Sequence, residues 1–206
     1  MSHALKTFLR FIWAGLVKPG QTGSIVPSQR VLVEKMIAPI PKTYSGLIVE
    51  LGAGNGALTL RLAARCPRVK ILAFEINPAL ARDNRRRLAK AGVDGRVEVI
   101  TGPAENLLSE MHRRGIKKVD YVASGIPLGS RGKRKTASLI DTVNKALSEG
   151  GMYIQFQHSL IDSRKIKKRF PNTRTVPVVL NFPPAVIYYA TKTGNSSPSP
   201  SPRAGR

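Results

Sequence analysis

The sequence contains a single cysteine, Cys66, among its 206 residues. An internal disulfide and a cysteine-based zinc cluster are therefore both excluded, and a reducing cytoplasm suits such a chain. Long apolar runs are missing as well, because none approaches the ~20 residues that a membrane-spanning helix requires. We therefore expect a cytoplasmic protein without a metal centre that meets a membrane, if at all, only from its surface.

Acidic residues are scarce. Twelve Asp and Glu stand against 34 Lys and Arg, which gives a formal net charge of +22. Such an excess attracts polyanions, so either nucleic acid or an anionic membrane surface is the expected partner, and composition does not choose between them. The length and a hydrophobic content of 42% leave room for one domain with a sizeable core.

Three glycines at alternating positions form the most informative stretch of the chain. The apolar residues 46–49 predict a buried parallel strand, and they lead through Glu50 into residues 51–56, Leu-Gly-Ala-Gly-Asn-Gly. Glycines let the chain turn tightly and let a ligand lie against the backbone. Residues 57–64 have helical periodicity, so the loop ends at a helix N-terminus that favours an anionic group. The pattern E-x-G-x-G-x-G resembles the cofactor loop of class I S-adenosylmethionine-dependent methyltransferases.

A second carboxylate, Glu75, ends the next predicted strand, residues 70–75. It follows Gly56 by 19 residues (75 − 56), close to the ~20-residue offset at which an acidic residue meets ribose in nucleotide-binding βαβ units. A carboxylate at that point can accept hydrogen bonds from both hydroxyls of an adenosine ribose. Glu75 is therefore a candidate cofactor ligand.

Strand and helix patterns alternate along the rest of the chain. We predict an α/β fold: a Rossmann-like, seven-stranded, mostly parallel sheet with helices on both faces and an antiparallel C-terminal hairpin. Ligands of open α/β sheets bind outside the carboxyl ends of the strands, so the glycine loop, Glu75, residues 104–105 and residues 124–128 should converge on one crevice. The predicted helices cover residues 28–37, 57–64, 77–91, 104–114, 136–148 and 164–169, and the predicted strands cover residues 46–49, 70–75, 97–101, 119–123, 152–156, 175–180 and 186–190.

The two ends of the chain differ in character. Residues 1–18 have apolar side chains at three- and four-residue spacing with Lys6 and Arg10 interspersed, the pattern of an amphipathic helix lying in a lipid interface. Packing of this helix on the domain's own core is an equally open alternative. Residues 193–206 are rich in Ser and Pro and should be disordered. We therefore divide the chain into a membrane-binding helix (1–18), a methyltransferase domain (19–192) and a tail.

Several further motifs resemble one branch of the methyltransferases, the bacterial phospholipid N-methyltransferases that act on phosphatidylethanolamine. They are Thr-Gly-Ser-Ile-Val-Pro-Ser at 22–28, the glycine loop at 49–56, Phe-Glu-Ile-Asn-Pro at 74–78, Ser-Gly-Ile-Pro-Leu at 124–128, Gln-Phe at 155–156 and Asn-Phe-Pro-Pro-Ala at 181–185. One departure is Pro103, which stands where these enzymes commonly have an acidic residue. The resemblance implies an N-terminal membrane-binding helix, matching residues 1–18.

The resemblance and the crevice together yield two sets of candidate binding residues. For the cofactor, S-adenosylmethionine, they are Thr22, Gly23, Glu50, Gly52, Ala53, Gly54, Gly56, Glu75, Ile76, Ala104, Glu105 and Ser124. For the acceptor, they are Ser28, Gly125, Ile126, Pro127, Arg131 and Lys133. The expected reaction methylates the amine of phosphatidylethanolamine, and of its mono- and dimethyl derivatives towards phosphatidylcholine, by a peripheral enzyme on an anionic membrane.

An amine must lose its proton before it attacks a methyl carbon, so a general base is an expected part of the site. His158, just past the fifth predicted strand, is the first candidate because the ordinary pKa of histidine lies near physiological pH. Tyr44 and Tyr153 are weaker candidates, and desolvation of the amine is an alternative to any base. Backbone carbonyls of residues 124–126 are candidates to orient the amine.

Two other functions compete with lipid methylation. An rRNA adenine N6-dimethyltransferase would use the positive charge on phosphates, but such enzymes usually carry Asn and an aromatic residue where this chain has residues 124–128. A binding module with a degenerate methyltransferase fold is the non-enzymatic alternative, against which the intact glycines and Glu75 argue.

Overall fold

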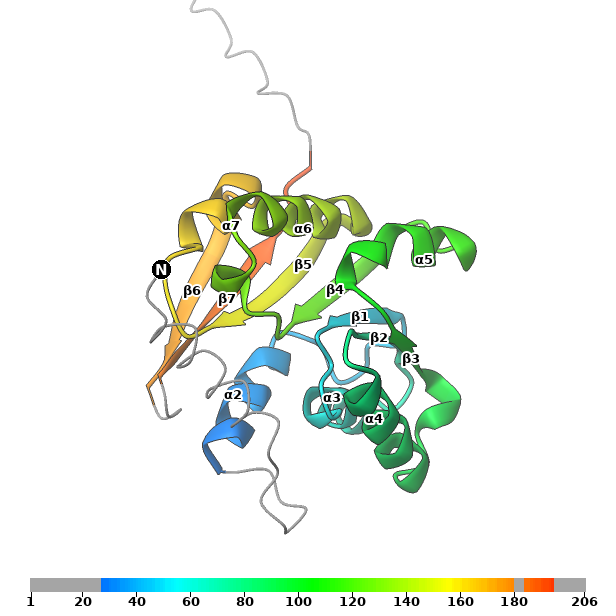
Figure 1. Ribbon diagram of the computed structural model, residues 1–206. Helices are drawn as coiled ribbons and strands as arrows, with labels where there is room; N and C mark the ends of the chain where they lie inside the picture. The colour runs from blue at the N-terminus through cyan, green and yellow to red at the C-terminus, as the bar shows by residue number, and fades with distance from the viewer. Residues whose placement is uncertain (1–26, 180–183, 195–206) are drawn as a thin grey trace, which may run out of the picture.

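One seven-stranded sheet runs through the computed structural model, which describes residues 27–179 and 184–194 (Figure 1). The strand order is β3-β2-β1-β4-β5-β7-β6, and only β7 runs antiparallel to its neighbours. The carboxyl ends of the other strands therefore lie on the same side of the sheet, which we call its carboxyl edge. The opposite side, where these strands begin, is its amino edge. The strands are β1 (Leu47–Leu51), β2 (Lys70–Glu75), β3 (Val97–Thr101), β4 (Val119–Ser124), β5 (Leu147–Gln157), β6 (Asn172–Val178) and β7 (Ala185–Thr191).

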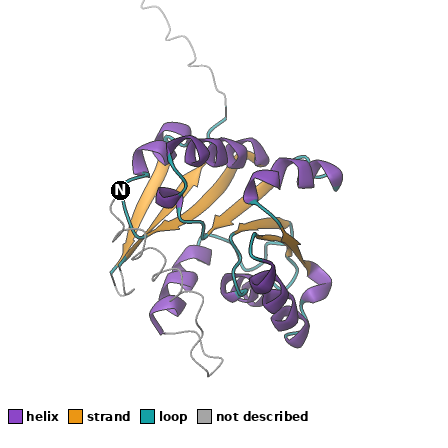
Figure 2. Cartoon of the chain, in the orientation of Figure 1, coloured by secondary structure: helices purple, strands orange, loops and turns teal. Residues whose placement is uncertain are grey.

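Helices cover both faces of this sheet (Figure 2). On one face lie α5, α6 and α7, and on the other lie α2, α3 and α4 (Figure 1). The helices are α2 (Pro27–Ile37), α3 (Ala57–Arg65), α4 (Pro78–Lys90), α5 (Leu107–Arg113), α6 (Lys133–Ala146) and α7 (Ser163–Arg169), joined by the short 3₁₀ turns η1 (Asp94–Arg96), η2 (Ala104–Asn106) and η3 (Leu128–Ser130).

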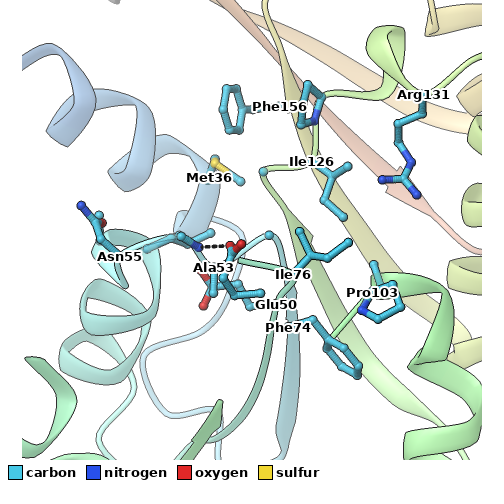
Figure 3. Close-up of a pocket in the computed structure, with 18 of the residues that line it drawn as sticks. Met36, Glu50, Ala53, Asn55, Phe74, Ile76, Pro103, Ile126, Arg131 and Phe156 are labelled. Carbon is cyan, nitrogen blue, oxygen red and sulfur yellow. Dashed lines mark hydrogen bonds between the residues drawn. The ribbon is translucent and has the colours of Figure 1, made fainter. Parts of the chain in front are cut away.

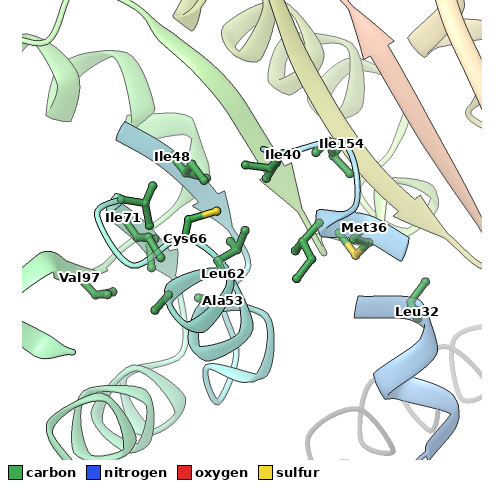
Figure 4. Close-up of a cluster of buried hydrophobic side chains, with 14 of the residues drawn as sticks. Leu32, Met36, Ile40, Ile48, Ala53, Leu62, Cys66, Ile71, Val97 and Ile154 are labelled. Carbon is green, nitrogen blue, oxygen red and sulfur yellow. The ribbon is translucent and has the colours of Figure 1, made fainter. Parts of the chain in front are cut away.

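The central strands are buried on both faces, which explains their continuous apolar sequence. Successive side chains of a strand point to opposite faces, so Ile48 joins the apolar cluster under α2 and α3 while Val49 joins the cluster under α6. Cys66 lies in the first of these clusters (Figure 4). The edge strand β6 is more exposed and contains Pro177, whose missing N–H group is tolerated at a sheet edge.

The predicted fold class is confirmed, with differences at element boundaries. The predicted strand 152–156 is the longer β5, which follows α6 directly at Leu147. Gly150 and Gly151, which fall between the predicted helix 136–148 and the predicted strand 152–156, lie inside that strand. The pairing register of β5 with β4 shifts between Val119 and Tyr121, and such an irregularity accommodates the positive φ of Gly150 (76°).

Some predictions concern residues outside the described part of the chain. The amphipathic helix 1–18, the loop that includes Thr22 and Gly23, and residues 195–206 of the tail all belong to this group. Ser28 lies within α2, but its side chain is likewise outside the description. The three-part division of the chain therefore stays a prediction.

Candidate functional site

A cavity of about 270 Å³ lies at the carboxyl edge of the sheet (Figure 3). Its walls come from the loops that follow β1, β2, β3 and β4, together with α2 and the end of β5. Twelve of the predicted binding residues line it: Glu50, Gly52, Ala53, Gly54, Glu75, Ile76, Ala104, Glu105, Gly125, Ile126, Pro127 and Arg131. The crevice predicted at the carboxyl ends of the strands is thus lined by residues that were expected to converge.

The glycine loop owes its shape to contacts with β2. The N–H groups of Gly52 and Ala53 both donate to the Phe74 carbonyl oxygen at 2.9 Å, which folds the chain back over the strand end. Gly52 has a φ of 76°, and a Cβ atom there would lie 2.9 Å from Cγ1 of Ile126. Only glycine therefore fits at this position without displacing the opposite wall of the cavity.

Glu75 is 2% exposed and ties the loop to its own strand. Its Oε2 accepts from the N–H of Gly54 at 2.7 Å, and its Oε1 accepts from the N–H of Asn77 at 2.8 Å. A carboxylate has about four acceptor positions, so these two bonds leave capacity on the side that lines the cavity. Hydroxyl groups of a ribose can use that capacity.

Glu50 is the most unusual group in the cavity wall. Its side chain is 1% exposed, and neither carboxyl oxygen has a hydrogen-bond partner among the described residues. Burial raises the pKa of Glu50 to about 8; the nearby Thr59 hydroxyl partly opposes this shift, and the neighbouring charge of Glu75 adds to it. A buried acidic group without a partner fits a cationic ligand, because the cation would satisfy the oxygens and favour the ionised form.

The Ser124–Leu128 turn is held by side chains of β5. Both Gln155 and Gln157 donate from Nε2 to the Ile126 carbonyl oxygen, at 3.1 and 2.9 Å. This carbonyl has both lone pairs engaged, so the predicted role in orienting an amine does not fit Ile126. The Ser124 hydroxyl accepts from the N–H of Ile126 at 3.3 Å, and Ser124 is fully buried and does not line the cavity. Its role is to shape the turn.

An ion pair joins two walls of the cavity. Arg131, which follows η3, pairs through Nη2 with Glu105 of η2, and both residues line the cavity. The Nε of Arg131 is buried and has no hydrogen-bond partner among the described residues. The positive charge of this cavity-lining guanidinium suits an anionic part of a ligand.

His158 lies behind the cavity wall. Its ring packs edge-on against the cavity-lining Phe156, with 5.6 Å between ring centroids. Its Nδ1 lies 3.0 Å from the Pro184 carbonyl oxygen, and because a carbonyl only accepts, Nδ1 carries the proton and Nε2 has the free lone pair. His158 itself does not line the cavity, so it does not reach a reacting group there.

The two tyrosines are not placed to act as bases. Tyr44 lies before β1 at the opposite edge of the sheet, where its hydroxyl donates to Asp120 Oδ2 at 2.9 Å. Tyr153 is fully buried, and its hydroxyl donates to Gln155 Oε1. Burial holds the pKa of both hydroxyls well above the usual range, which keeps them protonated. Tyr153 instead orients Gln155, one of the two residues that hold the turn.

Two more predicted ligands have other roles. Gly56 does not line the cavity, and a Cβ atom there would lie 2.2 Å from Asn84 Oδ1, so glycine is needed for α3 to pack against α4. Lys133 begins α6 and points away as an exposed side chain outside the cavity lining. Sequence proximity to the site suggested a ligand role that the geometry does not support.

One wall of the cavity was missed by sequence reasoning. Leu32, Val33 and Met36 of α2 line it, and Met36 and Phe156 border the same side in Figure 3. The apolar periodicity of residues 28–37 predicted a buried face, and part of that face covers the cavity rather than the core. Pro103, Asn55 and Ser130 also line the cavity without having been predicted.

The described residues add two negative findings. None of the helices among residues 27–179 and 184–194 is long and apolar enough to cross a membrane. Within the same ranges, no group of three or more His, Cys, Asp or Glu side chains is arranged to hold a metal ion.

Fold and cavity together define a methyltransferase, and comparisons with known proteins agree. The family model described as "Methyltransferase domain" matches residues 48–151, just over half of the chain, and the chain belongs to this family. An ornithine lipid N-methyltransferase from Singulisphaera acidiphila is 28% identical over 187 residues, covering 90% of this chain and 96% of the relative. A release factor glutamine methyltransferase from Moorella thermoacetica is 34% identical over 83 residues, 38% of this chain and 28% of the relative.

Solved structures share the fold at low sequence identity. An RNA methyltransferase from Salinibacter ruber, in complex with S-adenosyl-L-homocysteine, aligns with a TM-score of 0.60 at 19% identity, over 84% of this chain and 98% of that one. An O-methyltransferase from Thermotoga maritima aligns with a TM-score of 0.61 at 19% identity, over 86% of this chain and 69% of that one. Neighbours with such different acceptors establish the fold and leave the acceptor open.

The cofactor is S-adenosylmethionine, and the cavity residues fit it. Its sulfonium and amino groups are cations, which suit the unpartnered carboxyl of Glu50. Its ribose hydroxyls suit the remaining acceptor capacity of Glu75, and the close backbone of Gly52 leaves room for a ligand against the loop. The residues that would hold the cofactor thus come from β1, β2 and the loop between β1 and α3.

Proposed function

We propose that this protein transfers methyl groups from S-adenosylmethionine to the amine of a membrane lipid headgroup. The acceptor is phosphatidylethanolamine, followed by its mono- and dimethyl derivatives, towards phosphatidylcholine. The observation that carries the proposal is the similarity to the ornithine lipid N-methyltransferase, which spans almost the full length of both chains. That similarity extends well beyond the glycine loop that all methyltransferases of this class share.

That relative also motivates a second acceptor. Ornithine lipids and phosphatidylethanolamine both present an amine together with an anionic group, a carboxylate in one and a phosphate in the other. A guanidinium binds either anion, and Arg131 lines the cavity. The fold is therefore compatible with both headgroups, and the test must offer both.

The chain's own residues contribute position and desolvation to this reaction. The cofactor supplies an activated methyl group on a sulfonium, which an amine nitrogen attacks in line. Met36, Ile126 and Phe156 form an apolar side of the cavity, and an apolar surrounding lowers the pKa of an amine, so that the attacking nitrogen is neutral. Arg131 would hold the headgroup anion, leaving the amine over the methyl carbon. This division of labour needs no base inside the cavity.

The central experiment offers labelled S-adenosylmethionine to the full-length protein with phosphatidylethanolamine vesicles, ornithine lipid vesicles or total rRNA. We expect label in the lipid fraction, with phosphatidylethanolamine preferred. A preference for ornithine lipid would change the headgroup but keep the reaction class. Label found in RNA instead would overturn lipid methylation in favour of the rRNA alternative. Arg131→Ala should raise KM for the lipid more than it lowers kcat, which tests the headgroup contact.

The membrane attachment proposed for residues 1–18 has its own test. Removing them should reduce both sedimentation with anionic vesicles and activity on those vesicles, because each cation near such a surface contributes about 1 kcal/mol. Unchanged sedimentation after truncation would contradict the attachment. Activity on a short-chain, dispersed lipid serves as the control, since it requires no bilayer.

A further inference from the structure

Large apolar side chains on the described surface gather at one edge of the sheet. Those with substantial exposure are Ile76 (64%), Leu160 (63%), Ile161 (73%) and Val179 (75%), and a fifth, Leu108 in α5, is only 36% exposed. The four most exposed residues directly follow the carboxyl ends of β2, β5 and β6. This is the edge at which the cavity opens, so the distribution is tied to the site.

Two segments leave this edge of the sheet at the same level, on either side of β7. Gln157 of β5 and Pro177 of β6 both pair with Val186 of β7, so only β7 separates the end of β5 from the end of β6. The loop after β5 also approaches η3, which follows the Ser124–Leu128 turn of the cavity wall. A Cβ atom at Gly129 of η3 would lie 3.5 Å from Oδ2 of Asp162 in this loop. Residues 158–162 thus lie between η3 and the end of the β6–β7 hairpin.

Positive charge without an acidic partner follows these apolar residues along the chain. The helix α7 begins directly after the loop, and its exposed Arg164, Lys167 and Lys168 have no acidic partner among the described residues. The helix leads away from the carboxyl edge, because it ends three residues before β6 begins, so Arg164 is the one of these three cations that lies nearest the loop. The other two cations of this helix differ, since Lys165 pairs with Asp162 and Arg169 pairs with Asp141. Exposed aliphatic side chains next to free cations are the composition that binds an anionic lipid interface.

We propose that Leu160, Ile161 and Val179, together with Arg164, form a membrane-docking surface that seats the protein on an anionic bilayer. This docking surface is separate from residues 1–18 and lies in the folded domain. It turns the carboxyl edge, and with it the cavity mouth, towards the lipid headgroups. The docking itself stands on the observations above, while its purpose rests on the proposed function.

A bilayer fits this surface better than a nucleic acid. RNA would engage the cations through its phosphates but would leave Leu160 and Ile161 exposed to water. A lipid interface takes up both kinds of side chain, because the aliphatic groups enter the acyl boundary while the cations remain among the headgroups. The chain's net charge of +22 supplies long-range attraction to the same surface.

The test compares full-length variants in sedimentation with vesicles of phosphatidylethanolamine and phosphatidylglycerol. Leu160→Glu/Ile161→Glu should weaken vesicle binding by about tenfold or more, because it removes apolar burial and adds repulsion. Arg164→Glu should weaken binding at low salt by about fivefold for the cation removed, and the loss should shrink as salt is added. Val179→Glu is a single substitution outside the loop, directly after β6. It tests the docking surface independently if the double substitution in the loop causes misfolding.

The matched control is Lys42→Glu. This lysine is exposed and precedes β1, at the edge opposite the cavity, and the change in net charge equals that of the Arg164 variant. Binding of this control should stay near that of the unmodified protein. An equal loss in the control, or unchanged sedimentation of the Leu160/Ile161 and Val179 variants, would overturn the docking surface.

Two further measurements separate this inference from the proposed function. S-adenosylmethionine affinity, measured by calorimetry without lipid, should be unchanged in every docking variant, because none of these residues lines the cavity. Methyl transfer to a dispersed short-chain phosphatidylethanolamine should also persist. If no lipid accepts methyl groups, the proposed function fails while sedimentation still decides the docking surface. If lipid is methylated but the variants sediment normally, only the docking surface fails.

Discussion

The two edges of the sheet are built differently. At the amino edge, polar groups have partners: the Tyr44 hydroxyl and the Ser148 hydroxyl both donate to Asp120, at 2.9 and 3.0 Å, and Arg65 donates to two backbone carbonyls at 3.1 Å. At the carboxyl edge, Glu50 is buried without a partner. An unsatisfied carboxyl thus stands where a ligand can reach it, while the polar groups named at the opposite edge stabilise the fold.

The largest expected effect comes from breaking the carboxyl edge at Gly52. In Gly52→Val, the left-handed backbone is strained and the new side chain meets Ile126 across the cavity. We expect the affinity for S-adenosylmethionine to fall by about 100-fold, measured by calorimetry.

The control for Gly52→Val is Gly92→Val. Gly92 also has a positive φ (66°) but no atom within 4 Å of a Cβ position, and it does not line the cavity. It should lower the melting temperature and leave the affinity for S-adenosylmethionine intact. A loss of affinity as large in Gly92→Val would mean that general destabilisation, and not the closed cavity, explains the first result.

A second prediction concerns the unpartnered carboxyl. We expect Glu50→Gln to lower the affinity for S-adenosylmethionine by about tenfold or more, because the amide brings no charge to meet a cation. The same change should stabilise the ligand-free protein. Folding raises the pKa of Glu50 to about 8, so the proton on this carboxyl contributes to the stability of the folded state at acidic pH. That contribution is lost as the pH rises through 8.

The pH dependence gives the measurement. Thermal melts of Glu50→Gln and of the unmodified protein should differ more at pH 8 than at pH 5, with the variant more stable, because glutamine has no proton to lose. A difference in melting temperature that does not grow with pH would contradict the raised pKa. Unchanged affinity for S-adenosylmethionine would remove Glu50 from the cofactor site.

These contrasts also explain what the sequence could predict. The parallel part of the sheet, and with it the convergence of Glu50, Glu75 and the Ser124–Leu128 turn, follows from the alternation of strand and helix patterns and from the position of ligands at the carboxyl ends of parallel strands. The roles of Gln155 and Gln157 did not follow, because they depend on which carbonyl lies opposite them across neighbouring strands. Tyr44 shows the same limit: its chemistry suggested a base, but its place in the fold puts it at the wrong edge.

A third, smaller effect is expected at His158, which lies at the carboxyl edge but behind Phe156. A general base usually contributes 10²–10⁴-fold, whereas we expect His158→Asn to lower kcat by about tenfold at most, with an unchanged pH profile. The steady-state rate on short-chain phosphatidylethanolamine across pH 6 to about 9 measures this. The loss of a titrating step together with a larger fall in kcat would restore His158 as the base.

The smallest effect on activity should come from the amino edge. Tyr44→Phe removes the hydroxyl that donates to Asp120, and the free energy of unfolding should fall by about 1 kcal/mol. The control is Tyr121→Phe, whose ring stands edge-on to that of Tyr44 at 5.0 Å and should tolerate the change better. Urea titrations give the stability and the lipid assay gives the activity. Because the amino edge is far from the reacting groups, methyl transfer by Tyr44→Phe should equal that of the unmodified protein; a fall in rate without a fall in stability would mean that the two edges are coupled.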